Sequence, residues 1–222
     1  KAAERLYLQG DLMISSRAGF QKTYDLTERV LPGHIDTSMP SVQDWADHLL
    51  DQQLNCHGLV TAVGVTYRRR HAGLANAVKQ TIQQRLESGT LQAIQLPDQQ
   101  TYYARSNLFD QPLPRVSQRL QILSPFDNFI IQRARLHSLF NFDYQIECYV
   151  PAPKRRYGYF ALPLLYKDQF VGRIDCKAFR DQRRLALQRV HLECAKADTQ
   201  AVCTALAAAL PNFATVSYTH LT

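Results

Sequence analysis

The clearest periodic pattern of hydrophobic positions lies between residues 73 and 87. Apolar residues recur there at every fourth position: Leu74, Val78, Ile82 and Leu86. Residues at this spacing form one stripe along an α-helix, and the polar residues between them fall on its other faces. The pattern predicts an amphipathic helix ending at Gly89, followed by strands over 91–96 and 101–104 around a turn at Pro97-Asp98-Gln99.

The same order of helix, glycine and hairpin occurs at the start of the chain. Residues 1–9 are helix-like, Gly10 stands where a helix C-terminus favours glycine, and strands are predicted over 12–16 and 20–25 around a turn at 17–19. A helix followed by a hairpin is the second half of a winged helix-turn-helix. The repeat predicts the end of a truncated winged helix at 1–34 and a complete one at 35–106, with further helices over 42–55 and 61–68.

The pattern changes after residue 106. Residues 107–119, with Pro112 and Pro114, are typical of a linker. Beyond it we predict a helix over 128–140, followed by four strands over 144–150, 157–166, 170–178 and 184–193. A last helix is predicted over 197–209, with Pro211 ending it. Lys167-Asp168 predicts a tight hairpin turn.

The fold class predicted is therefore α+β. Tandem winged helix-turn-helix units, the first truncated, precede a C-terminal antiparallel β-rich domain with flanking helices at 120–215. Residues 216–222 read like a translated library adapter and are expected to be a non-native tail.

Composition narrows the function only slightly. The chain has 26 Lys and Arg against 19 Asp and Glu, a net charge of +7, which fits a nucleic-acid partner but also many proteins that bind none. No apolar run is long enough to cross a bilayer. None of the five cysteines is spaced as Cys-x-x-Cys and the histidines show no ligand spacing, so we expect no metal, no cofactor and reduced thiols in a cytoplasmic protein.

Four segments carry a resemblance to a known family. They are LSPFDNFIIQRARLHSL (123–139), FNFDYQIECYVPAPKRRYGY (140–159), FALPLLYKDQFVGRIDCKA (160–178) and GFQKTYDLTERVLP (19–32). Together they resemble the C-terminal part of the YcaQ/AlkZ family of winged-helix DNA glycosylases. The LSPFD and PAPKRRYGY segments are the specific ones, and the resemblance is weakest over 107–119.

The resemblance implies a fold and a reaction. Members have three tandem winged helices and a C-terminal β-rich domain, and they excise alkylated purines, including those in interstrand crosslinks. A Gln-x-Gln or Gln-x-Asp motif in the first winged helix carries the chemistry. The chain is then expected to be the C-terminal fragment of a monomeric, bacterial, nucleoid-associated enzyme that acts on alkylated or crosslinked double-stranded DNA.

One literal match to the catalytic motif exists, Gln9-Gly10-Asp11. It lies at a helix C-terminus beside a glycine, whereas the family motif lies in an N-terminal helix with apolar neighbours. We interpret it as a helix stop before a strand. No catalytic residue is therefore predicted in this chain; the motif is expected upstream of Lys1, and the fragment alone is expected to be inactive.

The strongest candidates for DNA contact are four adjacent residues: Lys154, Arg155, Arg156 and Tyr157. Three cations on a loop before a strand are suited to phosphates, and the tyrosine to stacking or wedging. The alternative is a solvated turn in which an arginine pairs with Glu147 or Asp143.

Further candidates lie on or near predicted helices. Arg68, Arg69 and Arg70 fall in the turn before the helix at 73–87, where winged helices approach the DNA backbone, although an exposed basic turn is an equal alternative. Lys79 is a weaker candidate on that helix.

Four more residues in the second half are candidates for DNA contact or chemistry. Arg133 and Arg135 are two positions apart and cannot share a helix face, so only Arg133 is proposed for DNA. Asp127 is interpreted as a helix cap or a buried partner for an arginine rather than a catalytic acid, and Asp175 as a charge on a sheet surface.

Two other function classes remain open on the sequence. A non-enzymatic tandem winged-helix regulator would explain the repeat and the basic turns, but not the resemblance of the C-terminal half. An interaction module with solvated basic loops is the third possibility.

Overall fold

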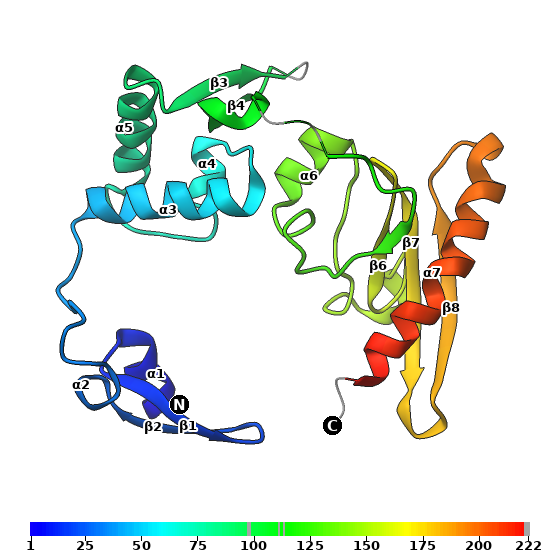
Figure 1. Cartoon of the computed structure of the whole chain (residues 1–222). Coiled ribbons are helices and arrows are strands. Elements are labelled where there is room, and N and C mark those ends of the chain that lie inside the picture. The colour runs from blue at the N-terminus through cyan, green and yellow to red at the C-terminus, as the bar shows by residue number, and fades with distance from the viewer. Residues whose placement is uncertain (97–98, 111, 113, 220–222) are drawn as a thin grey trace. The chain divides into compact units, whose positions relative to one another are not determined.

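The computed structural model describes residues 1–96, 99–110, 112 and 114–219. The chain divides into two compact units, Lys1–Ser41 and Val42–Thr222. Figure 1 shows their elements in chain order. Helices and antiparallel strands are combined in both, as predicted for an α+β chain.

The first unit is a helix followed by a hairpin. Its elements are α1 (Ala2–Gln9), β1 (Leu12–Ala18), β2 (Gln21–Leu26) and α2 (Thr27–Val30). Gly10 ends α1 in the left-handed region at φ 90°, and its N–H donates to the Tyr7 carbonyl at 3.2 Å. This helix stop is the one predicted. The turn differs from the prediction: Ala18 pairs with Gln21, which leaves a two-residue turn at positions 19 and 20.

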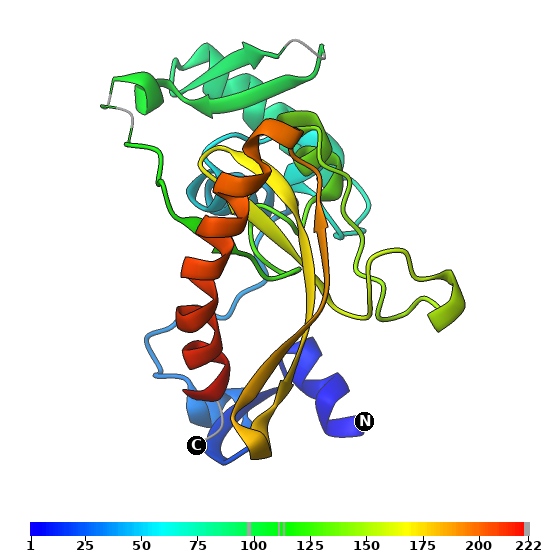
Figure 2. The same ribbon diagram turned by 90° about the vertical axis from the view of Figure 1, so that its right-hand side faces the viewer.

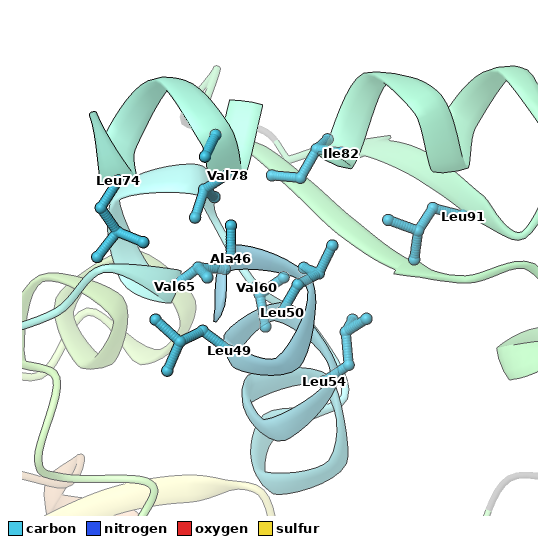
Figure 3. Packing of buried hydrophobic residues seen from close by; sticks show 11 residues of the cluster. Ala46, Leu49, Leu50, Leu54, Val60, Val65, Leu74, Val78, Ile82 and Leu91 are labelled. Carbon is cyan, nitrogen blue, oxygen red and sulfur yellow. The ribbon is translucent and has the colours of Figure 1, made fainter. Parts of the chain in front are cut away.

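The second unit begins with a helical lobe. Its elements are α3 (Val42–His57), α4 (Ala62–Val65), α5 (Leu74–Glu87), β3 (Leu91–Gln95) and β4 (Thr101–Arg105). The predicted stripe on α5 is confirmed, because Leu74, Val78 and Ile82 are buried in a cluster with residues of α3 (Figure 3). Leu86 is partly buried against the same cluster. The turn predicted at 97–99 includes residues 97 and 98, which lie outside the described residues.

The short helix before α5 is shorter than predicted. Thr61 caps it by accepting a hydrogen bond from the Gly64 N–H at 2.9 Å. Arg68 has φ 59°, which a right-handed helix cannot contain, so the chain leaves helical geometry before the basic run.

The rest of the second unit is a four-stranded antiparallel sheet with a helix on either side. Its elements are β5 (Leu120–Ile122), α6 (Arg133–Phe140), β6 (Ala161–Tyr166), β7 (Gln169–Phe179), β8 (Arg184–Leu192) and α7 (Thr199–Thr219). The strands lie in the order β5-β6-β7-β8. Figures 1 and 2 show α7 running along the sheet, where Val202 and Leu206 pack on Leu164 and Ile174.

Three element predictions in this part were wrong. The segment 144–150 is not a strand: Phe142, Tyr144 and Ile146 are buried or half-buried against Phe170 because the segment lies on the sheet rather than within it. The alternation that suggested a strand came from this covering role.

The helix predicted from residue 128 begins only at Arg133. Asp127 does cap a turn, accepting from the Phe129 N–H at 2.9 Å, but Gln132 has φ −97° and ψ 89°, which interrupts the helix. The side chain of Gln132 is buried.

The last helix does not end at Pro211. Proline lies inside α7, and Ala207 and Pro211 are both exposed. The carbonyl that lacks its usual donor is therefore on the solvent side, where water can satisfy it. The predicted tail at 216–222 includes the end of α7, and residues 220–222 lie outside the described residues.

Candidate nucleic-acid interface

The basic segment before β6, residues 154–157, belongs to a loop whose backbone is bound by two buried carboxylates. Glu147 accepts hydrogen bonds from the backbone N–H groups of residues 156–158 at 3.1, 2.8 and 3.1 Å. Asp175, on β7, accepts from those of residues 159 and 160 at 2.8 and 3.3 Å. Five consecutive backbone donors are thus fixed by two side chains, which gives the loop one backbone path.

Asp175 was wrongly predicted as a charge on the sheet surface. It is 4% exposed, because the loop folds over this face of β7 and offers it backbone donors. Gly158 makes the close approach possible: its φ is 141°, and a Cβ there would lie 2.1 Å from Oδ2 of Asp175.

Glu147 keeps its charge in this setting. Burial raises its pKa, but the three backbone donors together with the positive charge of Arg173 outweigh that effect, and the pKa lies below its ordinary value. Oδ1 of Asp143 lies 2.9 Å from Nδ1 of His137. Among the described residues, therefore, neither of these carboxylates forms a side-chain ion pair with the arginines of the loop.

The four candidates on this loop differ in what they contact. Lys154 and Arg156 are exposed, whereas the Nε of Arg155 donates to the Val150 carbonyl at 2.8 Å. The ring of Tyr157 lies 4.9 Å from the guanidinium of Arg156 and 3.9 Å from that of Arg173. A base that stacked on this ring would have to compete with these contacts.

Arg173 is a buried cation that the sequence analysis missed. It is 1% exposed and its guanidinium binds Glu193 at 2.8 Å and the Asp143 carbonyl at 2.9 Å. A lone arginine within an apolar strand, in GRIDC, was the available signal. Its guanidinium packs on the buried side of the Tyr157 ring and does not face solvent.

The structure brings Arg68 and Arg133 together. Both line a pocket of about 360 Å³ in the second unit, Arg68 from the turn after α4 and Arg133 from the start of α6. Phe126 and Tyr149 line the same pocket and are 67% and 90% exposed. Two guanidinium groups and two exposed aromatic rings thus share one concave site.

The two sides of this pocket are tied by a polar cluster beneath it. Nε2 of the buried Gln132 donates to Oε1 of Gln53 at 2.9 Å and to the Gly64 carbonyl at 3.4 Å. The hydroxyl of Tyr67 donates to the Ile131 carbonyl at 2.8 Å. These bonds join the helical lobe to the segment before α6.

His57 belongs to the same cluster. Its Nε2 lies 3.4 Å from Nε2 of Gln132, and burial, followed by repulsion from Arg135, lowers its pKa to about 4. The ring is therefore neutral at physiological pH.

The other candidates are placed apart from the pocket lining. Arg69 is half-buried and contacts Oε1 of Gln52 at 3.4 Å. Arg70 is exposed, and Lys79 lies on the exposed face of α5. Arg135 is half-buried and donates to the Asn128 carbonyl, so of the two arginines on α6, Arg133 is the exposed one.

A second basic surface was missed by the sequence analysis. Beyond the pairing with β6, the ends of β7 and β8 continue as a two-stranded ribbon, visible in Figure 2. It carries four exposed cations and one acid: Lys177, Arg180, Arg183, Arg184 and Asp181. Lys177 and Arg184 lie 4.9 and 4.3 Å from the ring of Phe179. The signal in the sequence was the density of cations in KAFRDQRR.

Within the described part of the chain, no helix is long and apolar enough to span a membrane. No group of three or more His, Cys, Asp or Glu side chains in that part could hold a metal ion. The sequence profile of a protein family described as DNA glycosylase AlkZ-like matches residues 1–215, in agreement with the resemblance of the LSPFD and PAPKRRYGY segments. No solved structure matches the chain.

Proposed function

Because the chain belongs to the AlkZ-like DNA glycosylase family, we propose that it is the DNA-gripping part of an enzyme that excises alkylated purines, including those in interstrand crosslinks. The reaction hydrolyses the N-glycosidic bond. Alkylation at N7 makes the purine a cationic leaving group, and the enzyme must hold a water at the anomeric carbon and stabilise an oxocarbenium-like state. We place the residues for that chemistry outside these 222 residues.

The setting of Gln9-Gly10-Asp11 supports this assignment of the chemistry to other residues. All three residues are exposed, and Gly10 ends α1 in the left-handed region. A helix stop of this kind leaves the two polar side chains on a free surface. It offers none of the water exclusion that strengthens electrostatic stabilisation in an active site.

The repeated local structure supports the proposal of winged-helix units. A helix, a glycine with positive φ and an antiparallel hairpin occur in α1–Gly10–β1–β2 and again in α5–Gly89–β3–β4. In the second copy two further helices, α3 and α4, precede α5. This is the order expected of a helix-turn-helix with a wing.

The observation that carries the proposed DNA contact is the shared pocket of Arg68 and Arg133. The planar guanidinium group suits the bidentate geometry of a phosphate. Exposed rings such as Phe126 and Tyr149 offer stacking surfaces of the kind that bind bases regardless of sequence. The exposed cations Lys154 and Arg156 and the basic β7–β8 ribbon extend the surface available to a polyanion.

Two measurements on the chain as it stands test this proposal. A fluorescein-labelled duplex containing one N7-methylguanine is titrated with the protein at several salt concentrations, and base release is followed in parallel. We expect binding that weakens with salt, no preference among sequences and no release of the base.

Other results would count against specific parts of the proposal. Measurable release would contradict the placement of the chemistry elsewhere. No binding at low salt would contradict the proposed role in DNA binding. A sequence-specific footprint would favour the non-enzymatic regulator.

A further inference from the structure

The tip of the β1–β2 hairpin carries an aromatic side chain with no packing role. Phe20 is fully exposed, at 103% of its reference area. It occupies the second of two turn positions, after Gly19, which supplies a positive φ of 60°. Two-residue hairpin turns of this kind need glycine first and commonly take a small polar residue second. The turn therefore does not explain why a phenylalanine stands there.

Two cations lie opposite one another just below the turn that carries this ring. Arg17 pairs with Lys22 in the register of β1 and β2, one residue pair below Ala18 and Gln21. Like charges directly opposite one another destabilise a hairpin. Both side chains are exposed, and among the described residues neither forms an ion pair.

The single acid of the hairpin does not relieve this repulsion. Asp25 accepts a hydrogen bond from the Leu26 N–H at 2.8 Å and its ion pair, at 3.5 Å, is with Arg29. Nζ of Lys22 lies 5.9 Å from the centroid of the Tyr7 ring. The tip thus presents an exposed apolar ring close in the chain to two uncompensated positive charges.

We propose that this tip is a DNA wedge: Phe20 enters between two base pairs while Arg17 and Lys22 bind phosphates on either side of the opened step. Apolar side chains used in this way unstack a base step, and neighbouring cations hold the strained duplex. The phosphates supply the anions that the Arg17–Lys22 pair lacks. The inference rests on the proposed DNA binding and adds the residue that would disturb the stack.

The test follows base stacking and affinity separately in the full chain. A duplex with 2-aminopurine in place of one adenine is titrated with wild-type protein, because 2-aminopurine fluorescence rises when the base loses its stacking partners. Fluorescence anisotropy of a labelled duplex gives the affinity under the same conditions. We expect a rise in 2-aminopurine fluorescence that saturates together with binding.

Phe20→Ala should abolish that rise while changing Kd by less than about threefold, since phosphate contacts dominate affinity. Phe20→Leu, which keeps an apolar wedge, should restore part of it. Leu8→Ala is the matched control, because Leu8 is another exposed apolar residue of the same unit, at 82%. Arg17→Ala with Lys22→Ala should weaken binding and lower its dependence on salt.

The outcomes separate the wedge from the proposed function. Saturated binding without any rise in wild-type protein, or an equal rise in Phe20→Ala, would overturn the wedge and leave DNA binding in place. No binding at low salt would overturn both. An aromatic tip with two cations just below it also suits an anionic lipid surface. Phe20-dependent binding to phosphatidylserine vesicles, without a 2-aminopurine response to DNA, would likewise overturn the wedge.

Discussion

The guanidinium of Arg173 lies 3.9 Å from the centroid of the Tyr157 ring. This contact joins a buried residue of β7 to the last of the four candidates on the basic loop. Because Arg173 also binds Glu193 and the Asp143 carbonyl, it links the loop, the sheet and the segment before Glu147. The loop that presents Lys154 and Arg156 is therefore built on internal polar contacts.

Replacing Arg173 should destabilise the second unit. Arg173→Ala leaves Glu193 and the Asp143 carbonyl without their donor and removes the cation beneath Tyr157. We expect the free energy of unfolding to fall by about 3 kcal/mol, measured by urea denaturation. Arg180→Ala, at an exposed position of the ribbon, should stay within about 0.5 kcal/mol of wild type. Equal effects of the two changes would contradict the supporting role of Arg173.

Gly158 should tolerate no side chain. In Gly158→Ala the new Cβ would lie 2.1 Å from Oδ2 of Asp175, at a φ that side chains rarely adopt. We expect a loss of about 2–3 kcal/mol and a lower melting temperature. Gly33→Ala is the control, because a Cβ there meets nothing within 4 Å. A neutral Gly158→Ala would mean that the two carboxylates do not fix the loop.

His57 should make stability depend on pH. Burial lowers its pKa from 6.5 to about 4 in the folded chain, so the unfolded chain takes up its proton first as the pH falls. The contribution of the neutral His57 ring to the free energy of unfolding is present above pH 6.5 and is lost as the pH falls from 6.5 to about 4. Stability therefore rises with pH over this range.

His57→Gln should flatten that dependence. The measurement is the urea midpoint of both proteins across this range, compared with their midpoints above about pH 7, where the ring is neutral in both states. Identical slopes for wild type and variant would contradict the assignment to His57.

The basic loop should contribute to affinity through charge. Changing Lys154, Arg155 and Arg156 together to alanine should weaken duplex binding by about tenfold or more and reduce its salt dependence. The fold should survive, because the backbone donors of residues 156–158 that bind Glu147 remain. Affinity insensitive to this change would favour the interpretation of the loop as merely solvated.

Local periodicity predicted what depends on local structure. Spacing and glycine placement were enough to predict the stripe on α5, the end of α1 at Gly10, the strands around Lys167-Asp168 and the hairpins β1–β2 and β3–β4. The structure contains all of them. β5 was missed because a three-residue edge strand carries too short a pattern. Pro211 misled because a helix on the surface can leave one carbonyl to water.

The site was less predictable, because its geometry arises from contacts distant in sequence. Asp175 and Glu147 look like surface acids until a loop folds over them and offers backbone donors. Arg68 and Arg133 could each be named from the sequence, but only the tertiary fold brings them to one pocket. The cations at the ends of β7 and β8 are dense in the sequence KAFRDQRR, but only the pairing of the two strands brings them onto one ribbon.

The shared pocket of Arg68 and Arg133 offers the most direct test of the proposed role in DNA binding. Duplex affinity is measured by anisotropy over a range of salt for wild type, for Arg68→Ala with Arg133→Ala, and for the control Arg115→Ala with Arg119→Ala, which removes the same charge from the exposed segment before β5. We predict that the pocket variant loses about tenfold in affinity and about 0.9 in salt slope for each phosphate contact removed, and that the control changes much less. Equal affinities and slopes for the pocket variant and the control would contradict the account.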